Sequence, residues 1–162
     1  MRSFVSALAA LLLAIVCSSC GIADGASTST VGRATSDVPE TLSAAVAAAQ
    51  ANADRFSSGD FAGVWERMSR EVRNGITRDD FVTFYETCKK VGPTIRVEGV
   101  SLDATQGTAV VRMDVGTTKQ PRIMAFEDGA WVMKPTPGFA AHLRQPVARI
   151  IAEETSAGLC PH

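Results

Sequence analysis

The spacing of apolar residues changes at Gly92-Pro93, and this change constrains the fold more than any other feature of the sequence. Before this point apolar residues recur every three or four positions, which is the spacing of one face of a helix. After it apolar and polar residues alternate, which is the spacing of a half-buried strand. Helices followed by a separate group of strands predict an α+β domain.

Three helices are expected in the first part of the domain. Asp37, with Glu40 three residues later, fits a capping box at the start of the first helix, and Gly59 fits its end. Asp60 can cap a second helix and Thr77 a third. Each helix carries apolar residues at helical spacing, so each is expected to bury one face.

About four antiparallel strands and a closing helix are expected in the second part. Gly99 shifts the parity of the first strand, which is the sequence mark of a β-bulge. Asp128-Gly129 separates two β-rich runs and predicts a tight hairpin, because both positions require positive φ. The strands are expected over residues 95–102, 109–115, 122–127 and 130–134, and the helix over 145–158.

Residues 1–19 have the pattern of an export signal. Arg2 supplies a positive charge, and the stretch from Phe4 to Val16 is apolar apart from Ser6. A bilayer span needs about 20 apolar residues, and this stretch is shorter. A buried helix would carry a polar face, which the stretch lacks. We therefore expect export, with residues 1–19 removed as a signal peptide.

Cys20 lies directly after this segment, between Ser19 and Gly21. This arrangement resembles the lipobox of bacterial lipoproteins, although Cys17 stands where the lipobox has Leu or another aliphatic residue. The resemblance implies that Cys20 is lipidated and anchors the chain to the extracytoplasmic face of the cell membrane. The alternative is signal-peptidase cleavage near Ala23 and free secretion.

Residues 20–36 are rich in small polar residues and show no periodicity. Such a composition is typical of a flexible tether. A folded domain held off a membrane needs a spacer, whereas a freely secreted domain does not, so this segment favours the lipoprotein. Residues 37–162 are then expected to form one folded domain.

Two blocks of the sequence carry a resemblance to a known family. The first is Arg55–Phe61, followed by Val64-Trp65, Phe81 and Tyr85, and the second is the hairpin Glu127–Val132. Together they resemble the NTF2-like (cystatin-like) domain of small lipoproteins in actinobacterial envelopes. The resemblance implies a cone of three N-terminal helices packed on a curved antiparallel sheet of about four strands, with a C-terminal helix. Such domains are mostly uncharacterised, so the resemblance implies a location and a shape rather than an activity.

Cys88 and Cys160 are the cysteines that follow Cys20. Exported proteins sit in an oxidising compartment, so the pair predicts a disulfide, worth about 4 kcal/mol in the chain-entropy model. The alternative is two separate thiols. A redox or metal role is not expected, because the domain has no CxxC motif.

No catalytic residue, metal or cofactor is expected from the sequence. His142 has no second ligand at metal-binding spacing and is expected at the surface, and Asp79-Asp80 fits helix capping better than catalysis. The net charge of −1 argues against a nucleic-acid partner, which requires clustered basic residues. Ketosteroid-isomerase-like enzymes share the NTF2-like cone, but their chemistry would need a carboxylate such as Asp114 facing Tyr85. Asp114 is expected to face solvent.

Aromatic residues form the candidate binding set, either as core or as the lining of a cavity for an apolar or amphipathic molecule. The candidate lining residues are Trp65, Phe84, Tyr85, Phe126 and Trp131. We therefore expect a non-catalytic, membrane-tethered domain that binds a small molecule or lipid. The alternatives are a module that docks on an envelope protein partner and, last, the isomerase-like enzyme.

Overall fold

The computed structural model describes residues 40–88, 92 and 94–160. The expected signal peptide of residues 1–19, the lipidation site Cys20 and the tether of residues 20–36 lie outside the described residues. Within the described ranges, no helix combines the length and the apolar character that a membrane span requires.

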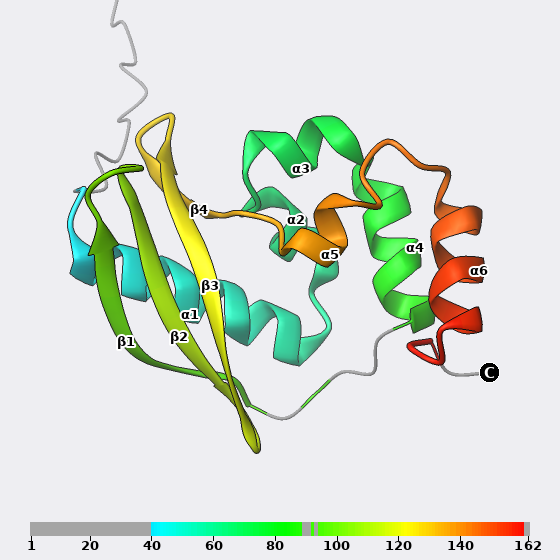
Figure 1. The fold of residues 1–162 in the computed structure, drawn as a ribbon, viewed down its shortest axis with the longest axis horizontal. Helices are drawn as coiled ribbons and strands as arrows, with labels where there is room; N and C mark the ends of the chain where they lie inside the picture. The colour runs from blue at the N-terminus through cyan, green and yellow to red at the C-terminus, as the bar shows by residue number, and fades with distance from the viewer. Residues whose placement is uncertain (1–39, 89–91, 93, 161–162) are drawn as a thin grey trace, which may run out of the picture. The chain divides into compact units, whose positions relative to one another are not determined.

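The described residues form an α+β unit with a four-stranded antiparallel sheet, as expected (Figure 1). Helices precede the sheet and follow it. The elements before the sheet are α1 (Leu42–Ser58), α2 (Phe61–Glu66), α3 (Arg70–Gly75) and α4 (Arg78–Cys88). The strands are β1 (Arg96–Asp103), β2 (Thr108–Val115), β3 (Thr118–Glu127) and β4 (Ala130–Met133), and the closing helices are α5 (Pro137–Ala140) and α6 (Val147–Ser156).

Local capping signals place three of the helices. The side-chain oxygens of Asp60 and Thr77 each accept a hydrogen bond from the backbone N–H three residues ahead, as the sequence predicted. Gly59 ends α1 with a φ of 82°, a left-handed conformation that glycine adopts without strain. The cap of α1 differs from the prediction: Thr41 accepts from the N–H three residues ahead, and Asp37 lies outside the described residues.

Within the described residues, the structure has one more helix before the sheet than the three expected. The additional helix is α3. The helical segment that begins with α2 is interrupted at Met68-Ser69, before α3 begins. There Ser69 N–H donates to Met133 O and Met133 N–H donates to Arg67 O, both at 2.9 Å. This parallel bridge to β4 replaces helical hydrogen bonds with bonds to a distant part of the chain, which local spacing cannot reveal.

The sheet has the strand order β1-β2-β3-β4, with every neighbouring pair antiparallel. The register of β1 on β2 shifts between Val97 and Gly99, which confirms the predicted β-bulge. Asp128 and Gly129 have φ values of 51° and 75°, which confirms the predicted tight hairpin between β3 and β4.

One face of the sheet, called here the inner face, is covered by α1 and carries the core. On β2 the inner face presents Ala109, Val111 and Met113, all buried. The residues of α1 packed against it include Ala45 and Ala49, which are fully buried and small enough to let the helix lie close to the strands. The helix and the inner face therefore form the two walls from which the candidate site is built.

Candidate functional site

A cavity of about 510 Å³ lies between the inner face of the sheet and the helices. Its walls come from α1, α2 and α4, from the inner face of β2 and β3, and from the segment that runs from β4 through α5. A side chain of α6 completes the lining. The cavity is partly open to the surface, and its volume lies in the range of small-molecule sites.

Aromatic rings form one wall of the cavity and centre on Tyr85. Ring centroids of five phenylalanines lie 4.5–5.9 Å from the Tyr85 centroid. The five are Phe56, Phe61, Phe81, Phe84 and Phe139. All except Phe61 also line the cavity. Offset and edge-to-face contacts of this kind fix ring orientations, so this wall is apolar and well ordered.

The predicted lining residues divide into two groups. Phe84 and Tyr85 line the cavity, whereas Trp65, Phe126 and Trp131 do not. Trp65 belongs to α2, and its Nε1–H donates to a backbone carbonyl at 3.1 Å. Phe126 and Trp131 pair with each other across β3 and β4, with ring centroids 5.4 Å apart. They belong to the packed core: Phe126 lies near the end of β3, away from the cavity-lining residues at its start, and Trp131 lies opposite it on β4.

Asn52, on α1, places an amide in the cavity wall among apolar neighbours. The residue is 3 % exposed, and its Nδ2 donates to the sulfur atoms of Met68 and Met133 at 4.0 and 3.9 Å. Its Oδ1 has no hydrogen-bond partner among the described residues. A buried polar atom without a partner costs about 1–3 kcal/mol. Asn52 therefore places a buried, unpaired carbonyl oxygen behind the cavity wall.

Strand β3 contributes two polar side chains to the inner face, Gln120 and Arg122, and both line the cavity. Arg122 lies opposite Val111 in the ladder, and its Nη2 donates to Gln120 Oε1 at 2.7 Å. Burial lowers the pKa of Arg122, and the neighbouring Tyr85 partly offsets this effect. An arginine still keeps its charge at neutral pH, so the cavity wall contains a cation.

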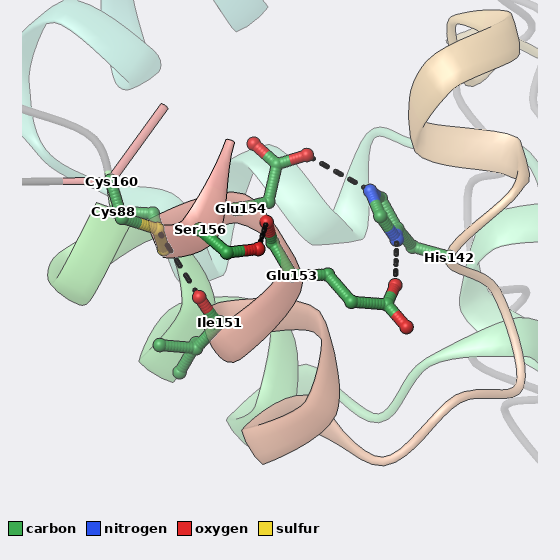
Figure 2. The surroundings of a disulfide bond; sticks show 7 residues. All are labelled: Cys88, His142, Ile151, Glu153, Glu154, Ser156 and Cys160. Atoms are coloured by element: carbon green, nitrogen blue, oxygen red, sulfur yellow. Dashed lines mark hydrogen bonds and ion pairs between the residues drawn. A yellow bond between two sulfur atoms is a disulfide. The ribbon is translucent and has the colours of Figure 1, made fainter. Parts of the chain in front are cut away.

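His142 and Glu154 form a hydrogen-bonded pair at another part of the wall (Figure 2). His142 Nε2 lies 2.9 Å from Glu154 Oε1, and His142 Nδ1 lies 3.8 Å from Glu153 Oε2. The His142 side chain is 16 % exposed and bonded to Glu154, which corrects the prediction that it is a surface or capping residue. Its partner is on α6, across a turn, and no local pattern in the sequence indicates that contact.

The predicted disulfide between Cys88 and Cys160 is present, with Cα atoms 4.1 Å apart. Cys88 is the last residue of α4, and Cys160 follows α6 closely (Figure 2). The bond therefore joins the helix that carries Tyr85 to the segment that follows Glu154. Tyr85 and Glu154 both line the cavity, so the disulfide holds two of its walls together.

Two other acidic positions lie away from the cavity. Asp80 accepts a hydrogen bond from the Thr77 hydroxyl at the start of α4, as expected for a capping residue, and the Asp79 side chain is 95 % exposed. Asp114 alternates with Met113 and Val115, which line the cavity, so it lies on the opposite face of the sheet. Among the described residues, no cluster of His, Cys, Asp or Glu is arranged to hold a metal ion.

Comparison of the chain with protein-family models, with curated proteins and with solved structures finds no match. The chemistry of the cavity wall is therefore the basis for assigning a function.

Tyr85 provides a direct test of the cavity wall, because it is the single tyrosine of the chain. Burial raises the pKa of Tyr85 from 10.0 to about 12; Glu154 adds to the rise and Arg122 opposes it. The ultraviolet absorbance of tyrosinate should therefore appear near pH 12 in the folded protein and near the ordinary value in guanidinium chloride.

The same shift predicts how stability depends on pH. Above the unfolded pKa the unfolded chain releases the Tyr85 proton while the folded protein keeps it, so this contribution to stability is lost as pH rises from about 10 to about 12. Tyr85→Phe should flatten the dependence in this window. An ionisation midpoint near 10 in the folded protein would show that the hydroxyl is open to water and would contradict the buried wall.

Proposed function

We propose that this protein is a non-catalytic, extracytoplasmic lipoprotein that binds a small apolar or amphipathic molecule in the cavity described above. The observation that carries the proposal is the cavity itself, about 510 Å³ in volume with an apolar wall and a few polar groups. Small-molecule sites typically have 300–1,000 Å³ and this kind of lining.

The finer fold assignment is part of the same proposal. The long α1 across a curved sheet, the bulge at Gly99 and the hollow between helix and strands support an NTF2-like cone. In such a cone the ligand would lie between the open end of the sheet and the helices, which is where the cavity lies.

The membrane anchor rests on the sequence around Cys20 together with the Cys88–Cys160 disulfide. Disulfides persist in oxidising compartments, so this bond supports a position outside the cytoplasm. Lipidation of Cys20 would hold the domain at the outer face of the membrane, and free secretion remains the alternative.

Cys20→Ser should move the protein from the membrane fraction to the medium, or leave it as an unprocessed precursor, because the acyl acceptor is gone. Cys17→Leu, which places an aliphatic residue at that lipobox position, is the matched control and should leave the protein in the membrane fraction. Fractionation with intact-mass measurement reads out both. A wild-type protein found in the medium without an acyl group would contradict the anchor.

The two alternative functions have less support. The large apolar side chains that are exposed among the described residues, Leu102, Ile123 and Leu159, belong to β1, to β3 and to the segment after α6. A docking surface gathers such residues into one patch, whereas these three belong to three separate segments, so the docking module has less support. For an isomerase-like enzyme, Asp114 would need to face the cavity, and it lies on the opposite face of the sheet.

Filling the cavity should abolish binding. Ala53 lines the cavity on α1, and Ala53→Leu would occupy part of its volume. Ala51→Leu is the matched control, because Ala51 is exposed on the same helix. The full chain carrying Cys20→Ser would be titrated with the neutral fluorescent probe N-phenyl-1-naphthylamine. We expect Ala53→Leu to weaken probe binding about tenfold or more, equivalent to about 1.4 kcal/mol.

The control variant should bind the probe as tightly as the unfilled protein, and circular dichroism should report the same helix content for all three. A protein that binds no probe, or one whose affinity falls equally in Ala51→Leu and Ala53→Leu, would contradict binding in the cavity.

A further inference from the structure

The chemistry of the cavity also indicates which class of molecule it accepts. We propose that the ligand is a single-chain amphiphile with an acidic headgroup, whose anionic oxygens bind Arg122 while its apolar chain lies against the aromatic wall. This inference rests on the proposed ligand-binding function and adds the ligand's charge and orientation to it.

Arg122 is fixed in place on the inner face of the sheet. Its Nη2 donates to Gln120 Oε1 at 2.7 Å and its Nη1 donates to Pro121 O at 3.0 Å. A guanidinium carries five N–H donors, so donors remain after these two bonds. Because Arg122 lines the cavity, a bound carboxylate or phosphate could accept from the remaining donors in the fork geometry that arginine favours.

The charge of Arg122 has no acidic counterpart within the described part of the chain. The interactions that the structure gives Arg122 are hydrogen bonds to Gln120 and Pro121 and the influence of Tyr85 on its pKa, and none of these is an ion pair with a carboxylate of the described residues. Arg122 is half-buried, so leaving its charge unpaired costs part of the penalty of a fully buried ion. An anionic ligand would supply the missing partner.

The other charged groups of the cavity lining favour the same sign of ligand. Lys134 is a second cation in the lining. Glu154 is the one carboxylate that lines the cavity in the described residues, and it already accepts a hydrogen bond from His142. A cationic ligand would be repelled by Arg122 and Lys134, and a neutral one would leave the guanidinium without a counter-charge.

The remaining lining suits a single apolar chain. Met113 lies opposite Gln120 in the ladder, and Met133 and the rings of Phe81 and Phe84 continue the lining. Methionine side chains are flexible and adapt to irregular ligands. The volume of about 510 Å³ is that of a site for one drug-sized molecule, which suits one chain with its headgroup.

The test compares two probes that differ in one charge, 11-(dansylamino)undecanoic acid and its methyl ester. Each is titrated by fluorescence into the full chain carrying Cys20→Ser, with and without Arg122→Met. Arg112→Met is the matched control, because Arg112 is exposed on the same sheet and lies opposite Pro121, off the cavity. Methionine keeps most of the length of the side chain and removes its charge, and replacing a half-buried ion by an apolar residue of similar volume is often tolerated by the fold.

We expect the acid to bind about tenfold or more tightly than the ester, as typical for hydrogen bonds to a charged group. Arg122→Met should remove most of this preference, leaving the part that Lys134 supplies, and the ester should still bind, which also shows that the variant is folded. Arg112→Met should keep the preference. Arg122→Lys, which retains the charge, should keep part of it.

Equal binding of acid and ester by the unsubstituted site would overturn the inference and leave the proposed cavity function standing. A preference that is undiminished in Arg122→Met would overturn it as well. Failure of both probes to bind would overturn the ligand-binding function together with the inference.

Discussion

The inner-face residues of β3 are polar near the start of the strand and apolar further along it, and the cavity depends on this change. Met124 is buried in the core, whereas Arg122 and Gln120, further toward the start of the strand, line the cavity. A guanidinium cannot be covered by close-packed apolar side chains without a penalty of several kcal/mol. The helices therefore pack tightly against one end of the sheet and leave a space at the other. A charged group on an inward strand position thus defines both the limit of the core and the start of the site.

The wall opposite β3 depends on two further interactions. The rings around Tyr85 fix the surface of α4, and the Cys88–Cys160 disulfide joins the end of α4 to the segment after α6. In the chain-entropy model such a bond contributes about 4 kcal/mol, which is a large share of the stability of a small domain. These restraints hold the walls of the cavity together, which would lower the entropy cost of the proposed binding.

Local chemistry made much of the fold predictable. Gly99, Asp128-Gly129 and Thr77 act through the backbone within a few residues, and each feature predicted from them is present. Features set by distant contacts were not predictable. The helix α3 is separate from α2 because Met68-Ser69 pairs with Met133, and His142 is half-buried against its partner Glu154 on α6.

The same distinction applies to the site. An aromatic residue looks alike in the sequence whether it packs in the core, as Trp131 does, or lines a cavity, as Tyr85 does. Arg122 carried a usable signal, since it shares the strand alternation of Met124 and a charge at an inward position is rarely accidental. The most direct test of the account is the set of nuclear Overhauser contacts between ¹³C-labelled dodecanoic acid and the protein. The account predicts contacts from the methylene chain to the ring of Tyr85, the single tyrosine; a bound acid that contacts only exposed side chains such as Ile123 would contradict it.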